Sequence, residues 1–174
     1  DWIYVTGEIG DAALALKHIF NEVVVESEYL ECVRKRLDYP RPRVLAGQAL
    51  REYASSAIDL SDGLLADLGH ICAASHVGAN IVLDDLPISN ALRDTVGLEK
   101  ACEIALAGGD DYELLFTVCE DNKVGMETAL ANTGNTITCI GQINRSEKIT
   151  STLNSKSVPI RAKSFEHFAS STDS

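Results

Sequence analysis

Two carboxylates and a hydroxyl lie close together at residues 59–63, where an apolar segment gives way to a helical pattern. They are Asp59, Ser61 and Asp62. Leucine and isoleucine then recur at the spacing of one helical face, so these polar groups lie where a helix begins. A helix start attracts anions through its free N–H groups and dipole, and carboxylates are preferred ligands of Mg²⁺. The pattern predicts a site for metal and phosphate; the alternative is simple helix capping, which needs no ligand.

A second acidic stretch combines two glycines with two adjacent carboxylates. Gly108 and Gly109 precede Asp110 and Asp111, just before an apolar segment. The glycines allow positive φ or a close approach to a ligand. The carboxylates repel each other unless a cation, an Arg or a cationic substrate lies nearby. The alternative is a glycine that ends a helix, followed by a solvated acidic turn.

A rigid basic segment, Arg41-Pro42-Arg43, stands out in a chain that is otherwise short of positive charge. It could contact phosphate. We consider it more typical of a segment that pairs with nearby carboxylates and thereby positions its loop.

The composition limits the class of protein. The chain has 174 residues and a formal net charge of −11, which argues against nucleic acid or an anionic membrane as a partner. No apolar run approaches the roughly 18 residues that a transmembrane helix needs, and no signal peptide is recognisable. Its 5 cysteines are scattered without a C-x-x-C pair, which indicates reduced thiols in a cytosolic protein. Because the sequence opens at Asp1 inside a strand-like segment, we interpret it as a piece of a longer protein.

Helices and strands are predicted along the whole chain. The first helix follows Asp11, whose side chain could cap it, and carries an apolar face of Leu16, Ile19, Phe20 and Val23. Further helices are expected at 30–37, 50–57, 64–75, 89–95, 98–107 and 124–130. Strands are expected at 2–6, 81–83, 112–119 and 136–143, with weaker signals at 149–153 and 158–160. This order lacks strict βαβ alternation, so it favours an α+β layered domain over a doubly wound sheet.

Five motifs occur in the order and register typical of the thiamine-monophosphate kinase family. They are Gly7-x-x-Gly10-Asp11-Ala12-Ala13, Arg41-Pro42-Arg43, Ile58-Asp59-Leu60-Ser61-Asp62-Gly63-Leu64, Gly108-Gly109-Asp110-Asp111-Tyr112-Glu113-Leu114 and Phe165-Glu166-His167-Phe168. The chain resembles the C-terminal domain of this family over residues 1–168, and residues 169–174 are expected to form a disordered tail. The resemblance implies an α/β/α layered domain with a mixed sheet, like the C-terminal domain of aminoimidazole ribonucleotide synthetase.

The resemblance also implies roles for individual residues. Asp59 and Asp62 correspond to Mg²⁺ ligands, and Ser61 corresponds to a contact with the ATP phosphates. Asp110 and Phe165 correspond to residues that contact thiamine. Family members commonly carry Glu where this chain has Asp110, so its carboxylate reaches one methylene less far.

The implied reaction is ATP-dependent phosphorylation of thiamine monophosphate to thiamine diphosphate in the cytoplasm, by a full-length protein that is a homodimer. No residue is assigned as a general base, because the acceptor is already an anionic phosphate oxygen. Metal ions would supply the positive charge that the chain lacks. The piece alone is expected to fold but not to catalyse. The alternatives are a non-catalytic binding or assembly module and another ATP-dependent synthetase of the same superfamily.

Overall fold

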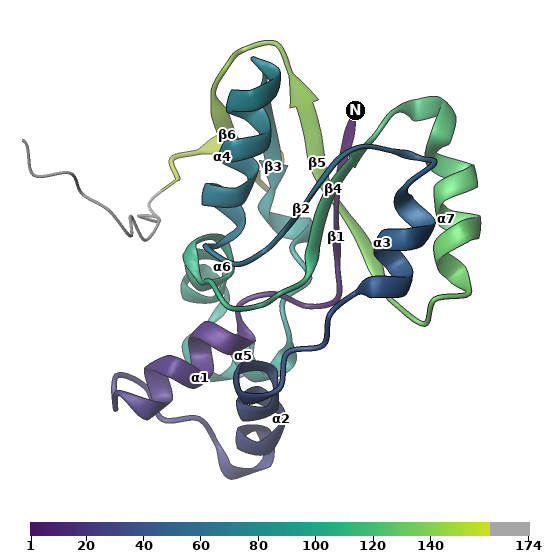
Figure 1. The fold of residues 1–174 in the computed structure, drawn as a ribbon. Coiled ribbons are helices and arrows are strands. Elements are labelled where there is room, and N and C mark those ends of the chain that lie inside the picture. Colours follow the sequence, from purple (N-terminus) through teal and green to yellow (C-terminus); the bar gives the residue numbers. More distant parts are fainter. Residues whose placement is uncertain (161–174) are drawn as a thin grey trace, which may run out of the picture.

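The computed structural model describes residues 1–160, and Figure 1 shows how their helices and strands are arranged. In chain order the elements are β1 (Trp2–Thr6), α1 (Asp11–Ile19), α2 (Ser27–Asp38), α3 (Val44–Leu50), β2 (Ala54–Asp59), α4 (Leu64–Ser75), β3 (Gly78–Val82), the short helix η1 (Leu83–Asp85), α5 (Asn90–Val96), α6 (Leu98–Ala107), β4 (Leu114–Val118), the short helix η2 (Glu120–Asn122), α7 (Lys123–Ala131), β5 (Ile137–Asn144), β6 (Ile149–Leu153) and β7 (Lys156–Val158).

The seven described strands form one sheet in the order β2-β4-β1-β5-β3-β6-β7. Strands β3 and β6 run parallel, and the other neighbours are antiparallel. The predicted α+β domain with a mixed sheet is therefore confirmed. Because β2 pairs with β4 and its last residue Asp59 lies opposite Leu114, the end of β2 meets the start of β4.

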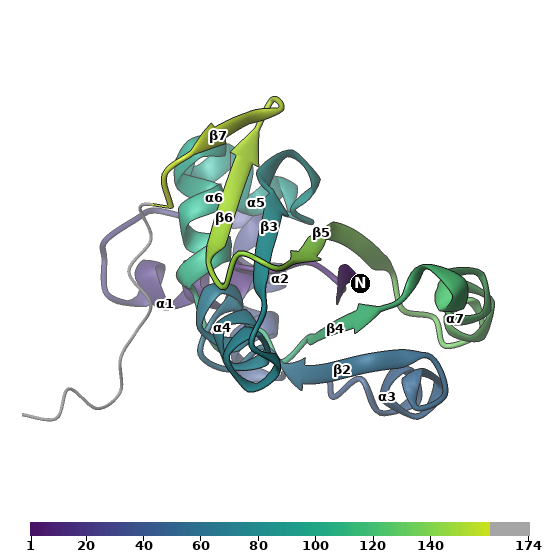
Figure 2. The same ribbon diagram turned by 90° about the horizontal axis from the view of Figure 1, so that it is seen from above.

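Helices cover both faces of the sheet (Figure 2), with α3 and α7 on one side and α4, α5 and α6 on the other. Successive side chains along the strands point alternately to the two faces of the sheet. Ile3 and Leu115 belong to the larger apolar core, whereas Tyr4 and Phe116 belong to a smaller core under α3 and α7. The rings of Tyr4 and Phe116 stack with centroids 5.6 Å apart. This period-two alternation gives the sheet two apolar faces and produces the α/β/α layering.

One predicted helix is wrong. The segment with Leu50, Tyr53, Ala54 and Ala57 was expected to be helical, but α3 ends at Leu50 and residues from Ala54 onward form strand β2. Alanine favours helix in isolation. Pairing with β4 overrides that preference, and the hydroxyls of Ser56 and Thr117 share a hydrogen bond of 2.7 Å across the two strands.

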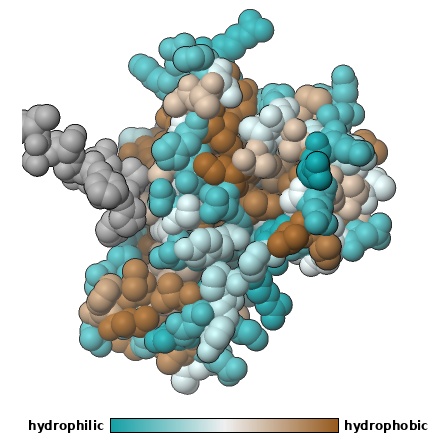
Figure 3. Space-filling model, viewed as in Figure 1, coloured by the Kyte–Doolittle hydropathy of each residue, from teal (hydrophilic) through white to brown (hydrophobic). Residues whose placement is uncertain are grey.

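The first helix also differs from its prediction. Asp11 does not cap α1, since Gly10 is the N-cap residue and the buried Asp11 carboxylate instead accepts a hydrogen bond from Ser89 Oγ at 2.5 Å. Most of the predicted apolar face of α1 is exposed, with Phe20 64% accessible, whereas Val23 packs partly buried against the larger core. Figure 3 shows apolar side chains on the surface over α1, where the exposed residues are Leu16, Ile19, Phe20 and Val24.

The remaining predicted elements occur in the structure, some of them with shifted bounds. Strand β3 begins at Gly78 rather than at residue 81, and β7 ends at Val158, where the last strand was predicted to begin. Helix α6 has the predicted bounds, and the predicted strand 112–119 is shorter, because β4 begins at Leu114. All five cysteines are free. Within residues 1–160, no helix is long and apolar enough to cross a membrane. Phe165, the predicted boundary at residue 168 and the predicted disordered tail at 169–174 lie outside the described residues.

Candidate functional site

The first acidic loop, residues 59–63, connects the end of β2 to the start of α4. Gly63 precedes the helix with φ 108°, a conformation that side chains strongly disfavour. Beyond it, Leu64 and Leu68 are buried in the larger core and fix the helix on the sheet. The loop is therefore held between a paired strand and a packed helix.

The second acidic loop, residues 108–113, lies directly against the first. The Asp110 N–H donates to the Ser61 carbonyl at 3.0 Å, and the Tyr112 N–H donates to the Leu60 carbonyl at 2.9 Å. The Leu60 N–H returns a bond of 2.8 Å to the Glu113 carbonyl. These bonds continue the β2–β4 pairing beyond the strands. The structure thus brings together Ser61 and Asp110, which are far apart in the sequence.

Gly109 makes this close approach possible. A Cβ atom at Gly109 would lie 2.4 Å from the Ser61 carbonyl oxygen, which is far inside van der Waals contact. The two acidic loops can pack this closely only because residue 109 has no side chain.

Three predicted site residues keep their carboxylates nearly free of partners. Within the described part of the chain, the side chains of Asp59 and Asp62 make no hydrogen bond or ion pair. The exposed Asp110 carboxylate accepts one long hydrogen bond, from Tyr112 Oη at 3.4 Å. Carboxylate oxygens are hard ligands of the kind that Mg²⁺ prefers, so the residue types of the two loops fit this cation.

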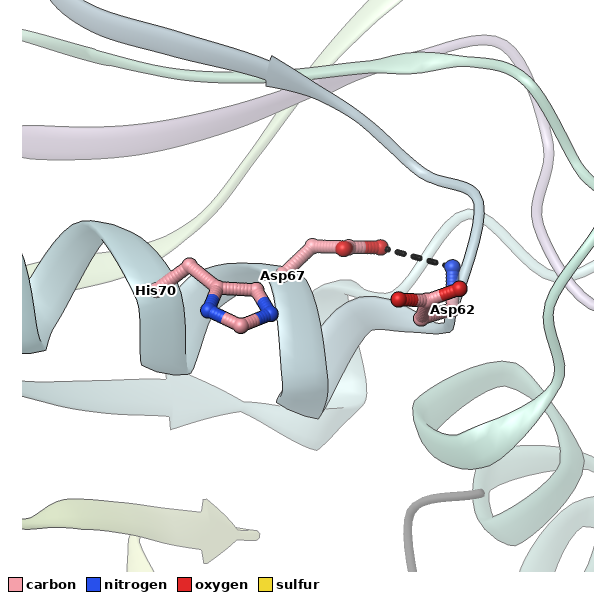
Figure 4. A group of neighbouring side chains, drawn as sticks. All are labelled: Asp62, Asp67 and His70. Carbon is pink, nitrogen blue, oxygen red and sulfur yellow. Dashed lines mark hydrogen bonds between the residues drawn. The ribbon is translucent and has the colours of Figure 1, made fainter. Parts of the chain in front are cut away.

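Two residues that were not predicted to be ligands join Asp62 (Figure 4). Ligand atoms of Asp62, Asp67 and His70 all lie within 4.8 Å of one another, and Asp59 is not in this group. Asp67 is buried and His70 is exposed. Their i, i+3 spacing, which puts both on one face of α4, was the signal that could have identified them.

The Asp67 carboxylate changes the expected chemistry of the helix start. Its Oδ2 atom accepts hydrogen bonds from the N–H groups of Ser61, at 3.1 Å, and Asp62, at 3.2 Å. Burial, together with the nearby charge of Asp62, raises the pKa of Asp67. These two N–H groups, which precede the N-cap residue Gly63, are therefore not free to bind phosphate.

The second acidic loop contains a carboxylate of the same kind. Asp111 Oδ2 accepts the Gly10 N–H at 2.8 Å, just before α1 begins. Burial raises the pKa of Asp111 to about 7, and the charges of Asp11 and Glu113 act in the same direction. On either side of it, Asp110 and Tyr112 have φ of 67° and 50°. Such strained backbone persists only where surrounding contacts impose it.

Those contacts centre on Glu113, which is 2% exposed. Arg43 approaches it with two nitrogens, its Nε at 2.6 Å and a terminal nitrogen of the same guanidinium. Thr6 Oγ1 donates to it at 2.6 Å, and Arg36 lies 3.4 Å away. The expectation that the basic segment pairs with a carboxylate is confirmed for Arg43.

Comparison with known proteins gives a consistent result. No family model matches the chain. The chain is 47% identical over 171 residues to the thiamine-monophosphate kinase of Escherichia coli strain K12. The alignment covers 97% of this chain and 53% of that protein. The chain thus spans about half the length of the curated relatives it matches.

Solved structures agree. The thiamine-monophosphate kinase of Stenotrophomonas maltophilia K279a matches 91% of this chain and 51% of its own, with a TM-score of 0.80 and 40% identity. AaThiL complexed with AMPPCP and TMP matches 97% of this chain and 51% of its own, with a TM-score of 0.76 and 30% identity. The Escherichia coli hydrogenase maturation protein HypE, at 18% identity and a TM-score of 0.64, shares the fold alone.

Proposed function

We propose that this chain, a homologue of the thiamine-monophosphate kinases over about half of their length, supplies the C-terminal half of an active site that transfers a phosphoryl group from ATP to thiamine monophosphate, giving thiamine diphosphate. The observation that carries the proposal is the backbone pairing of the two acidic loops, in which the Asp110 N–H bonds the Ser61 carbonyl at 3.0 Å. A relative described as complexed with AMPPCP and TMP matches 97% of the chain, which supports it.

The first acidic loop is proposed to receive the nucleotide. Asp59 and Asp62 would hold Mg²⁺, since their carboxylates have no partner among residues 1–160. The Ser61 hydroxyl would contact the ATP phosphates. When bound, Mg²⁺ neutralises charge that builds up between donor and acceptor phosphates. The chain's own residues orient the metal and the phosphates, and none is proposed as a general base.

The second acidic loop is proposed to receive thiamine monophosphate. Thiamine carries a cationic ring, and the exposed Asp110 carboxylate offers it an opposite charge beside the phosphate-binding loop. This carboxylate reaches one methylene less far than the Glu common in the family, so its contact with the ring requires the ring to lie closer to the loop. Phe165 would stack on the thiamine pyrimidine, at a gain on the order of 1 kcal/mol.

The complete protein is proposed to be a cytoplasmic homodimer that binds neither nucleic acid nor membrane. The net charge of −11 supports the last two points, since an acidic surface repels polyanions and anionic lipid. The 174-residue chain alone is proposed to fold without catalysing. Asp59 and Asp62 are only part of a metal-ligand set, and an incomplete shell with few nearby cations cannot bring two anionic substrates together.

A chimera tests this function. In the Escherichia coli kinase, the 171-residue matching region is replaced by this chain, and thiamine diphosphate is measured with Mg²⁺, ATP and thiamine monophosphate. The active parent kinase and the isolated chain are the controls. We expect product from the chimera and none from the isolated chain.

A folded chimera that makes no product would overturn the proposal and favour a non-catalytic module. Product from the isolated chain at the parent's rate would refute the division of labour between two halves.

A further inference from the structure

We propose that Asp67 is a positioning residue, which presets the first acidic loop by holding the backbone of Ser61 and Asp62 and is not itself a ligand of the cation. This inference rests on the proposed function only for the assignment of the first acidic loop to Mg²⁺ and phosphate. The contact itself is independent of any ligand.

The geometry ties the loop to the first turn of its own helix. A single atom, Asp67 Oδ2, accepts the N–H groups of two successive loop residues, Ser61 at 3.1 Å and Asp62 at 3.2 Å. The Asp67 backbone is fixed in turn, because its N–H donates to the Gly63 carbonyl at 3.0 Å. The loop is therefore closed on itself within six positions, with Asp67 2% exposed.

The neighbouring carboxylate is placed differently. Asp62 is half-buried, and its side chain has no hydrogen bond or ion pair in the described chain. A buried carboxylate needs hydrogen bonds to offset its desolvation, whereas a metal ligand must leave its lone pairs available. Asp67 meets the first condition and Asp62 meets the second (Figure 4). The two adjacent carboxylates thus divide the tasks of holding the loop and binding the cation.

This division has a consequence for how phosphate is bound. Free N–H groups at a helix start would themselves form an anion site. Here the internal anion Asp67 occupies the N–H groups of Ser61 and Asp62, which come just before the N-cap residue Gly63. Phosphate is therefore not received by these two N–H groups, and the Ser61 hydroxyl and the bound cation are the contacts proposed for it. The loop does not need to rearrange when a ligand arrives, since its closing anion is already present.

Two substitutions separate holding from ligation. Asp67→Asn keeps a side-chain oxygen that can accept both N–H groups but removes the charge. Asp67→Ala removes the acceptor. Glu28→Ala is the matched control, because Glu28 also lies in the first turn of a helix but is exposed. Amide hydrogen exchange of Ser61 and Asp62 is followed by NMR in the 174-residue chain, and Mn²⁺ affinity is measured on the same samples.

We expect Asp67→Asn to keep both amides protected and to change Mn²⁺ affinity by less than about threefold. Asp67→Ala should speed exchange at both amides at least tenfold and weaken Mn²⁺ binding.

If Asp67→Asn keeps the amides protected but weakens Mn²⁺ binding more than tenfold, Asp67 is a ligand and the inference is overturned. Unchanged exchange in a folded Asp67→Ala chain also overturns it. Should Asp67→Ala not fold, the Asn variant alone decides. Absence of Mn²⁺ binding in the unsubstituted chain would count against the proposed function, while the exchange data would still decide the role of Asp67.

Discussion

The two acidic loops share one plan but are held in place by different means. Each presents a carboxylate with few partners, Asp62 or Asp110, and each anchors a second one, Asp67 or Asp111, on backbone N–H groups. In the first loop the anchor lies in the next helical turn. In the second loop the anchoring contact reaches back about 100 residues to Gly10.

The first loop is therefore held by contacts between neighbouring residues, whereas the second is held by contacts that form only in the complete fold. The first loop needs β2, α4 and its own sequence. The second loop has positive φ at Asp110 and Tyr112 and depends on the Glu113–Arg43 ion pair, whose partners are 70 residues apart. Substitutions at the anchors of the second loop should therefore affect the stability of the whole domain.

The largest expected effect follows from the buried ion pair. Glu113→Gln removes the charge that Arg43 meets and leaves a guanidinium only 17% exposed without its counter-ion. Breaking one partner of a buried pair typically costs about 3–5 kcal/mol. We expect a loss of this size in the free energy of unfolding, measured by urea denaturation.

The exposed pair Lys17–Glu22 is the control for this substitution. Its side chains are 36% and 53% accessible, so Glu22→Gln should cost less than about 1 kcal/mol. Equal losses from the two substitutions would show that Glu113 has no special role in holding the second loop.

A smaller effect is expected where the two loops touch. Gly109→Ala places a Cβ atom 2.4 Å from the Ser61 carbonyl oxygen, so the loops must separate. Such overpacking costs about 1–3 kcal/mol. Gly69→Ala is the matched control, because Gly69 lies inside α4 with open space around it and alanine there should stabilise the helix by about 0.5–1 kcal/mol. Thermal unfolding of both variants measures the difference, and a neutral Gly109→Ala would argue against tight packing of the two loops.

The smallest expected effect is a pH dependence at the second anchor. The pKa of Asp111, raised by burial to about 7, lies above its value in the unfolded chain, so the folded state binds more protons. This contribution to stability is present at acid pH and is lost as the pH rises from about 4 to about 7. Between pH 6 and pH 8 it should lower the free energy of unfolding by roughly 1–2 kcal/mol.

Asp111→Asn should flatten that part of the pH profile, since the amide does not titrate. Asp11 and Asp67, whose pKa values burial also raises, remain in the variant and account for the residual slope. Identical profiles for the variant and the unsubstituted chain would contradict an elevated pKa at Asp111.

The sequence predicted those parts of the fold that depend on local patterns. Helix α4 follows from its run of leucines, and the alternation in β4 places Phe116 and Leu115 on opposite faces, as the two apolar cores confirm. Strand β2 was missed because its serines and alanines form a strand only beside β4. The exposure of the apolar face of α1 could not be predicted for a related reason, since periodicity identifies an apolar face but not what covers it.

For the candidate site, the sequence identified individual residues but not the contacts between distant segments that hold them. Residue types and motif order identified Asp59, Asp62, Ser61 and Asp110, and their roles remain predictions, as does that of Phe165. Neither the backbone bond from Asp110 to Ser61 nor the pairing of Glu113 with Arg43 could be read from spacing, because each joins distant segments. Asp67 was overlooked for a different reason: a carboxylate inside a helix normally indicates a solvated face.

The central claim is that the partner-free carboxylates bind ligands while the anchored ones hold the loops. Asp62→Ala in the chimeric kinase tests it most directly, by measuring turnover and the free energy of unfolding on the same protein. We expect turnover to fall on the order of a hundredfold or more, equivalent to about 2.7 kcal/mol of transition-state stabilisation. Stability should change by less than about 0.5 kcal/mol, because the Asp62 side chain has no partner within residues 1–160. Near-normal turnover in a folded Asp62→Ala chimera would contradict the account.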